Sequence, residues 1–510
     1  MESNMLNRMK NGFSRRKFLK SSVAFGAMTL AMPAIIRAAD FKVPGGMPSP
    51  NGPLSWLDSG GRKGQFHKAT LPLYGKAAGI ETVYDGLPWS ELKKVLPLGI
   101  KNGSAPETFC LPNTMEGAVA VNDGWAQPIE DFIPDFKNWK SAYPEGSFIE
   151  GINVFDGVTY GFPYGGQRRY DDLVLFNQDK MNEVGYDNIG PERGMTYDEI
   201  RDAASKITKT GTPGIIMGGK AAWRWGTVAT HLAQRSGNPV GSWGLLAGMN
   251  FLKGEYDYAS DAYIQAVELL LAMRDDGSFF PGINTIIPPQ AREFMTQGAA
   301  GMVIQGPWNI PIWQDSAPNF KFGVSPLAAP DKSAFNNPLF NPSLMQTGNL
   351  MFINRKAKNP DYVGGYFSWL GSLEGQIAYA NVGTCADPAL FPEVLGYAKL
   401  TENEKAAIAM AENHVRIHPN PSVRNSDIAK VAISFVQPTL SVSKAIQGLF
   451  TGQLSGVRET LQGVADSQNK ALDNAIAKAK ADGAKVDRED YVFSNWDPFK
   501  DYGTAQYAEL

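Results

Sequence analysis

The stretch "EFMTQGAAGMVIQGPWNI", residues 293–310, carries the clearest structural signal in the chain. Its apolar centre predicts a short buried strand over Met302 to Ile304, between glycine-containing turns. Glycines around a strand also suggest a phosphate-binding loop, but the Lys-Ser/Thr pair and the following helix of such a loop are missing. We therefore interpret the stretch as a buried strand that ends in a turn carrying Trp308.

Strand and helix patterns alternate on both sides of this stretch. Strands are predicted over 79–84, 105–111, 173–176 and 347–354, and helices over 88–103, 261–277, 362–380 and much of 402–483. A further helix over 196–211 begins with a capping box, Thr196 with Glu199, and ends at Gly211. Alternation of this kind predicts an α/β protein.

Composition limits the classes of function. The chain has 510 residues, 43% of them apolar, and a formal net charge of −3, which allows two domains and gives no basic field for nucleic acid. Cys110 and Cys385 are the two cysteines, too few for a disulfide scaffold. Two buried thiols are one interpretation and a single late disulfide is the other.

Basic residues are concentrated at the N-terminus, where residues 1–38 hold seven of them against one acidic residue. The segment "SRRKFLK", residues 14–20, resembles the twin-arginine export signal. The apolar stretch 21–36 contains Pro33 and is short for a membrane span, so it predicts a signal peptide that is cleaved near Ala38. A chance basic patch before a membrane anchor is the alternative. Residues 39–53, rich in proline and glycine, predict a flexible mature N-terminus.

Motifs for catalysis, cofactors and metals are missing from the sequence. It contains no G-x-S-x-G elbow, no C-x-x-C pair and no H-E-x-x-H helix. His414 and His418 are four residues apart, and we interpret them as a solvated helix end rather than a metal site. Acidic residues that could pair as a glycosidase acid and base are Asp171, Asp172, Asp257 and Asp261. We therefore expect no cofactor and no enzyme activity.

Aromatic residues beside glycines and polar residues suggest a binding cleft for a small molecule. Trp225 lies in "AAWRWG", Trp308 in "GPWNIPIW" and Tyr164 in "FPYGG". Aromatic faces stack on the CH-rich faces of sugars, while neighbouring polar groups bind the hydroxyls. Each aromatic residue could equally be part of the core, and we expect this of Trp125 and Trp313.

Several segments, in order, resemble the extracellular solute-binding proteins of sugar ABC importers, the group that contains maltose-binding protein. The more specific of them are residues 293–310 and "TGNLMFINRKAKNPDYVGGYFSWLGSLEGQIAYANVGTCADP", residues 347–388. Residues 106–133, 160–185 and 195–207 are similar to further family segments. The resemblance covers roughly residues 54–480.

The resemblance implies a periplasmic binding protein of type II, with two α/β lobes joined by crossover strands and the ligand cleft between them. Lobe 1 would comprise 54–162 and 348–400, and lobe 2 would comprise 163–347 and 401–485. The crossings would fall near 162–168 and 346–351. The tail, 486–510, has no counterpart in the family.

The resemblance also implies a carbohydrate ligand and candidate residues that bind it. Trp308 holds the position of a family tryptophan that packs against a sugar, and the segment of Trp225 supplies a second contact. The candidates, which lie at strand ends and crossovers, are Asp58, Ser59, Asn113, Tyr164, Gln167, Arg168, Arg224, Trp225, Trp308, Gly348 and Asn349. The partners would be the twin-arginine translocase during export and an ABC permease in the inner membrane, for a monomer in the periplasm.

Departures from the family pattern leave the ligand open. The "QRR" segment, residues 167–169, brings two arginines to the first crossover. They would bind an anionic sugar, such as a uronic acid or a phosphate ester, or they are surface charges at a strand edge. A secreted carbohydrate-active enzyme and a binding protein for a polyamine or a peptide are the two rival functions.

Overall fold

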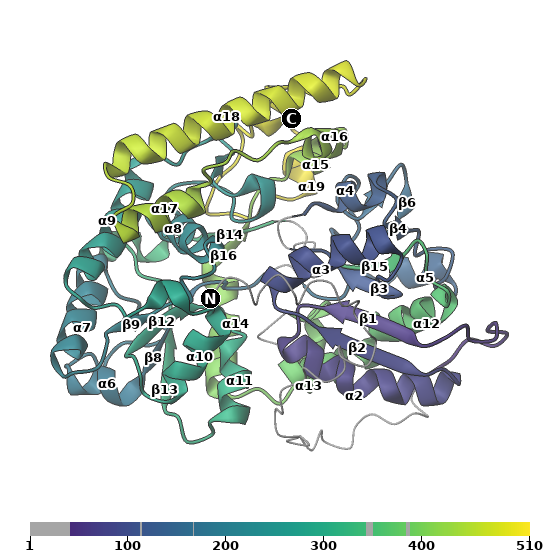
Figure 1. The fold of residues 1–510 in the computed structure, drawn as a ribbon, viewed down its shortest axis with the longest axis horizontal. Helices are drawn as coiled ribbons and strands as arrows, with labels where there is room; N and C mark the ends of the chain where they lie inside the picture. Colours follow the sequence, from purple (N-terminus) through teal and green to yellow (C-terminus); the bar gives the residue numbers. More distant parts are fainter. Residues whose placement is uncertain (1–40, 113–114, 167, 343–349, 384–387) are drawn as a thin grey trace, which may run out of the picture. The chain divides into compact units, whose positions relative to one another are not determined.

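The computed structural model describes residues 41–112, 115–166, 168–342, 350–383 and 388–510. The described residues all belong to one compact unit, Ala38–Leu510. Two larger β-sheets organise this unit, and helices cover both of them (Figure 1).

The first sheet has the order β2-β1-β3-β15-β4, and β7 pairs with β15. Its strands are β1 (Leu54–Asp58), β2 (Thr82–Gly86), β3 (Thr108–Cys110), β4 (Ala126–Gln127), β7 (Gly161–Pro163) and β15 (Leu350–Asn354). Strands β2 and β3 are parallel to β1, whereas β15 runs antiparallel to β3. The carboxyl ends of three strands therefore meet at one edge, where α/β proteins bind ligands.

The second sheet has the order β13-β8-β12-β9. Its strands are β8 (Leu173–Asn177), β9 (Ile215–Ile216), β12 (Met302–Gln305) and β13 (Phe322–Ser325). All four residues of β12 are buried, as the apolar run in the sequence predicts. Because β12 is parallel to β9 and antiparallel to β8, the carboxyl ends of β12 and β9 share an edge with the amino end of β8.

The chain passes between the sheets more than once. It leaves β7 at Pro163 and enters β8 at Leu173, and it returns to the first sheet at β15. After α12 (Pro360–Leu370), α13 (Leu373–Gly383) and η7 (Pro392–Tyr397), it reaches α14 (Glu402–His414), which packs against β13. The predicted α/β fold with two lobes and crossover segments is confirmed.

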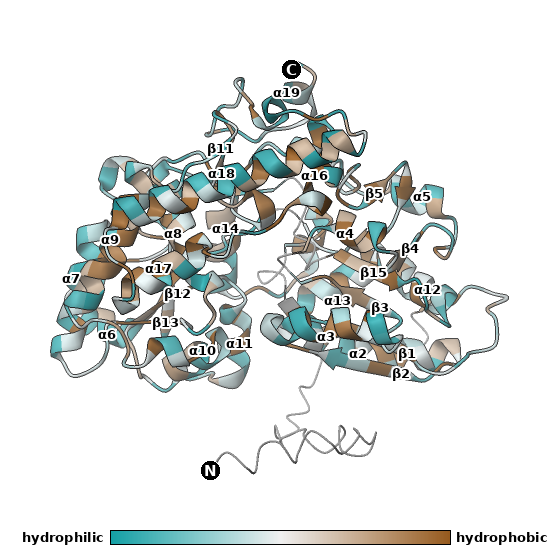
Figure 2. Cartoon of the chain, turned by 45° about the horizontal axis from the view of Figure 1, so that its top comes forward, coloured by the Kyte–Doolittle hydropathy of each residue, from teal (hydrophilic) through white to brown (hydrophobic). Residues whose placement is uncertain are grey.

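Helices surround both sheets. Around the first sheet they are α2 (Gly61–Ala78), α3 (Trp89–Asn102), α4 (Gly117–Asn122) and α5 (Phe136–Ser141). The second lobe contains α6 (Gln178–Glu183), α7 (Tyr197–Lys209), α8 (Trp223–Arg235), α9 (Asp261–Asp275), α10 (Pro288–Thr296), α11 (Asn309–Ser316), α15 (Pro421–Arg424), α16 (Ile428–Ser434), α17 (Val442–Thr451) and α18 (Val457–Ala481). Figure 2 shows hydrophilic and hydrophobic residues alternating around α18, whose buried residues include Leu461, Val464, Leu472 and Ile476.

Short elements complete the described residues. They are the pairs β5 (Val154–Phe155) with β6 (Val158–Thr159), β10 (Met249–Asn250) with β11 (Glu255–Tyr256), and β14 (Leu339–Asn341) with β16 (Val415–Ile417), together with η3 (Gly244–Leu246), η4 (Ile283–Thr285), η5 (Lys332–Asn336), η8 (Arg488–Tyr491) and α19 (Thr504–Tyr507).

Capping residues explain one correct and one wrong helix prediction. The capping box of Thr196 and Glu199 is present at the start of α7, as predicted. The single helix predicted over 362–380 is wrong, because α12 ends at Leu370 and α13 begins at Leu373. The hydroxyl of Ser372 accepts a hydrogen bond from the backbone N–H of Gly375, so a serine cap starts a new helix inside the apolar run.

The prediction of a solvated helix end for His414 and His418 is wrong for His418. Strand β16 separates the two residues, and His418 is buried with its ring 4.8 Å from the ring of Phe251. Burial lowers the pKa of His418 to about 4, so the imidazole is neutral at neutral pH. Among the described residues, no group of three or more His, Cys, Asp or Glu side chains could hold a metal ion.

The C-terminal tail packs on the second lobe through aromatic residues. Tyr491, Phe493, Trp496 and Tyr502 are buried, and the backbone N–H of Phe493 donates to the carbonyl of Phe251 at 2.7 Å. The sequence pattern could not show this, because irregular segments bury aromatic residues without a period. No helix in the described part of the chain has the length and apolar character needed to cross a membrane.

Candidate functional site

Asp58 ends β1 at the carboxyl edge of the first sheet, and its carboxylate is completely buried. It accepts hydrogen bonds from the indole N–H of Trp56, the backbone N–H of Gly60 and the hydroxyl of Tyr84. Burial raises the pKa of Asp58, and the nearby Lys63 ammonium and these donors partly offset that rise. Asp58 therefore holds the turn between β1 and α2, and the partly exposed Ser59 follows it.

Lys63, Trp89 and Tyr164 lie together near this edge. The Lys63 ammonium is 5.9 Å from the centre of the Trp89 ring and 5.7 Å from that of Tyr164, both within the range of cation–π attraction. Trp89 begins α3 and is partly exposed, whereas Tyr164 is buried just after β7. At this edge of the first sheet, the buried Lys63 ammonium therefore lies beside the partly exposed ring of Trp89.

The corresponding edge of the second sheet lies at the pairing of β8 and β12. Leu173 is opposite Gln305, so the residues before β8 lie beside the residues after β12. One segment carries Arg169 and Asp171, and the other carries the Gly-Pro-Trp turn that ends at Trp308.

Trp308 is partly exposed, and two neighbours define its position. A side chain at Gly306 would collide with the six-membered ring of Trp308, so the indole can fold back only over a glycine. The Arg169 guanidinium lies 5.2 Å from the centre of the same ring. Trp308 therefore forms an aromatic platform beside a cation.

Asp171 connects this platform to a second indole. Its carboxylate is buried, forms an ion pair with Arg169 and accepts a hydrogen bond of 3.1 Å from the indole N–H of Trp243. Trp243 is partly exposed. Asp171 thereby orients the guanidinium of Arg169 and the indole of Trp243 at the same edge. These two interactions restrict the rotation of both side chains.

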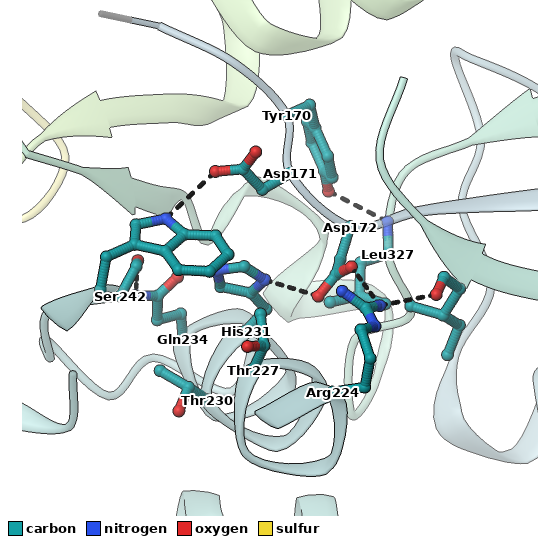
Figure 3. A network of polar contacts seen from close by, with 12 residues as sticks. Tyr170, Asp171, Asp172, Arg224, Thr227, Thr230, His231, Gln234, Ser242 and Leu327 are labelled. Carbon is teal, nitrogen blue, oxygen red and sulfur yellow. Dashed lines mark hydrogen bonds and ion pairs between the residues drawn. The ribbon is translucent and has the colours of Figure 1, made fainter. Parts of the chain in front are cut away.

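A buried polar network supports this edge from below (Figure 3). Asp172 accepts hydrogen bonds of 2.7 Å from Arg224 Nη2 and lies 2.7 Å from His231 Nδ1. Arg224 also donates to the carbonyl of Ile304 at 2.7 Å, so it joins α8 to β12 and to Asp172, the residue directly before β8. Burial raises the pKa of Asp172, but Arg224 and His231 outweigh it, and the pKa is lowered overall.

The cavity beside the Gly-Pro-Trp turn has the size of a small-molecule site. Its volume is about 320 Å³, and Arg169, Tyr170 and Pro307 line it together with Glu145 and Glu412. The lobes also contact each other directly, because Arg62 of α2 forms an ion pair with Asp315 of α11.

The structure assigns several candidate ligand residues to the interior. Trp225 is completely buried, its ring packs 4.3 Å from that of Phe450, and its indole N–H donates to the carbonyl of Gly219 at 3.0 Å. Buried as they are, Trp225, Asp58 and Tyr164 present little or no surface to solvent. We therefore give these three residues structural roles instead of direct ligand contacts.

The remaining predicted ligand-binding residues differ in their surroundings. Arg168 forms an exposed ion pair with Asp501 of the C-terminal tail. Arg224 is 1% exposed, yet its Nε and Nη1 have no hydrogen-bond partner among the described residues, so its ligand contact stays a prediction. Asn113, Gln167, Gly348 and Asn349, as well as Cys385, lie outside the described residues.

Sequence reasoning missed Lys63, Trp89 and Trp243 as site residues, and it named Arg169 and Asp171 only as a possible anion-binding arginine and a possible catalytic acid. Arg169 and Asp171 carried a usable signal, because charged residues directly before a buried strand lie at its end. Trp243 carried none, since it lies directly before η3, a short element remote in sequence from Asp171.

The chain matches the sequence profile of the family "Bacterial extracellular solute-binding protein" over residues 60–377. A relative in Brucella abortus (strain 2308), whose name calls it a binding protein, is 26% identical over 280 residues, 52% of this chain and 59% of the relative. The chain thus matches about three-fifths of that relative's length.

Solved structures show the same fold. An ABC transporter solute-binding protein from Thermotoga lettingae TMO, bound with α-D-tagatose, superimposes with a TM-score of 0.61 at 16% identity, covering 82% of this chain and all of that chain. The maltotriose-binding protein of Thermus thermophilus, bound with maltotriose, has a TM-score of 0.59 at 15% identity, covering 82% and 99% of the two chains. By its sequence match over residues 60–377, the chain belongs to the family of bacterial extracellular solute-binding proteins.

Proposed function

We propose that this protein captures a carbohydrate outside the cytoplasm and delivers it to the membrane permease of an ABC importer. The observation that supports this most is the platform of Trp308, with Arg169, Asp171 and Trp243 beside it. Indole surfaces pack against the CH faces of sugars, and a fixed guanidinium donates hydrogen bonds to hydroxyl groups. Structural neighbours that are bound with tagatose and maltotriose have the same fold.

Lobe closure is the proposed mechanism. The first lobe offers the partly exposed Trp89, with the buried Lys63 ammonium beside its ring, and the second lobe offers Trp308 and Trp243. A solute that touches both sets binds the closed arrangement more tightly than the open one, so binding shifts the population towards closure. No bond in the solute has to break, and we propose that the protein is not an enzyme.

Replacing Trp308 by alanine should weaken saccharide binding at least tenfold, because the sugar loses its aromatic platform. Isothermal titration calorimetry with a panel of neutral oligosaccharides and uronic acids would measure the change, after a thermal-shift screen has found a ligand. The matched control is Tyr397→Ala, which removes an aromatic side chain that is 60% exposed and distant in sequence from the platform. Unchanged affinity in Trp308→Ala would refute the platform as the binding surface.

We also propose that the twin-arginine pathway exports the protein and that cleavage occurs near Ala38. Arg15 and Arg16 form the arginine pair of the N-terminal segment. Changing both to lysine should keep the charge and abolish export, which fractionation of the periplasm followed by immunoblotting would detect. Normal periplasmic levels of the double-lysine variant would contradict this route.

A further inference from the structure

A second cavity, of about 100 Å³, lies where α4 of the first lobe approaches η3, α16 and η8 of the second lobe. Glu116, the residue that precedes α4, contributes the carboxylate. Trp243, Tyr256, Phe435 and Tyr491 contribute aromatic rings. The acidic group therefore comes from one lobe and the aromatic groups come from the other.

Glu116 is the single charged residue among the described residues that line this cavity. The backbone N–H of Leu245 donates a long hydrogen bond of 3.4 Å to Oε1 of Glu116. Burial raises the pKa of Glu116, and this hydrogen bond offsets the rise only in part. A partly buried carboxylate without a neighbouring cation is costly, and a bound cation would remove that cost.

The polar atoms of two of the four aromatic residues, Trp243 and Tyr256, already form hydrogen bonds elsewhere. The indole N–H of Trp243 donates to Asp171 at 3.1 Å, and the hydroxyl of Tyr256 donates to the carbonyl of Leu245 at 2.5 Å. Their contribution to the cavity is consequently aromatic carbon surface. Rings around a single carboxylate are the surroundings that proteins use to hold ammonium groups.

We propose that this cavity binds the ammonium group of an organic cation, such as a primary amine, a quaternary amine or an amino sugar. The inference rests on the proposed function in one respect, namely that the two lobes close on a solute. Because the carboxylate and the rings belong to different lobes, an ammonium group in the cavity stabilises their contact. The cavity would therefore select cationic solutes over neutral ones.

The test uses tetramethylammonium chloride as the probe, with sodium chloride at the same concentration as the reference. Calorimetric titration of the mature protein should show saturable binding of tetramethylammonium. Glu116→Gln keeps the acceptor for Leu245 but removes the charge, and it should weaken binding at least tenfold. Asp123→Asn is the matched control, because it removes one charge from the exposed far end of α4 and should leave binding unchanged.

A second variant, Ala118→Leu, fills the cavity from α4 without altering charge and should also weaken binding. Absence of saturable binding, or equal binding by Glu116→Gln and the unaltered protein, overturns the inference. Saccharide binding that depends on Trp308, without any tetramethylammonium binding, would leave the proposed function standing alone. The reverse result would support the cationic site and refute the carbohydrate function.

Discussion

Replacing Asp172 by alanine should lower the free energy of unfolding by about 3 to 5 kcal/mol, because it leaves a buried cation without its partner. Arg224 and His231 converge on this carboxylate, and both side chains are at most 1% exposed. Urea denaturation followed by tryptophan fluorescence would measure the loss. Loss of a buried ion pair, which leaves a cavity and an uncompensated charge, causes one of the largest decreases in stability that a single substitution can produce.

The control for this experiment is an exposed ion pair. Asp275 pairs with Arg274 at 2.7 Å, and its side chain is 64% exposed, so Asp275→Ala should change stability by no more than about 0.5 kcal/mol. If Asp172→Ala were equally mild, the network in Figure 3 would not support the second lobe in the way described.

The pH dependence gives an independent check on Asp172. Its pKa is lowered in the folded protein, so its contribution is fully present above the ordinary value of 3.8 and is lost as the pH falls through the folded pKa. The stability difference between the unaltered protein and Asp172→Asn should therefore shrink below about pH 4. A difference that stays constant in this range would contradict the charge-based explanation.

Replacing Trp225 by alanine should also cost about 3 to 5 kcal/mol, but through packing and not through ligand binding. The indole is completely buried against Phe450 and Phe279, and its removal leaves a cavity between α8 and α17. Trp223, two residues earlier on α8, is partly exposed, so Trp223→Ala is the matched control and should cost clearly less.

The affinity of the folded Trp225 variant distinguishes a core residue from a ligand contact. Trp225→Phe keeps most of the buried volume and should bind saccharide as tightly as the unaltered protein, measured by calorimetry. A tenfold loss of affinity in Trp225→Phe would restore Trp225 as a ligand contact. Trp308→Ala should show the opposite behaviour, with weaker binding and little loss of stability.

Local patterns were enough to predict the α/β class and several individual elements. The capping box at Thr196 and Glu199 and the buried strand at Met302 to Gln305 depend on interactions within a few residues, which periodicity and residue type reveal directly. The resemblance of two segments to the solute-binding family added the prediction of a two-lobed architecture.

The roles of individual site residues depended on contacts between remote parts of the chain. Trp225 and Trp308 look alike in sequence, as tryptophans beside glycines and polar residues. The packing of α17 on α8 buries Trp225, whereas the described part of the chain leaves Trp308 partly exposed. Whether an indole belongs to the core or to a surface is a property of its neighbours in space.

The sequence by itself determined which segments form strands, to within a few residues, which charges precede them and that a Gly-Pro-Trp turn follows a buried strand. Only the tertiary structure decided that Asp171 joins Arg169 to Trp243 and that Glu116 meets aromatic rings from the other lobe. Trp243 lies more than 70 positions after Asp171, and the aromatic rings beside Glu116 lie more than 120 positions after it, so sheet pairing and lobe contact bring these residues together. Local periodicity carries no information about such pairs, because it records only neighbours along the chain.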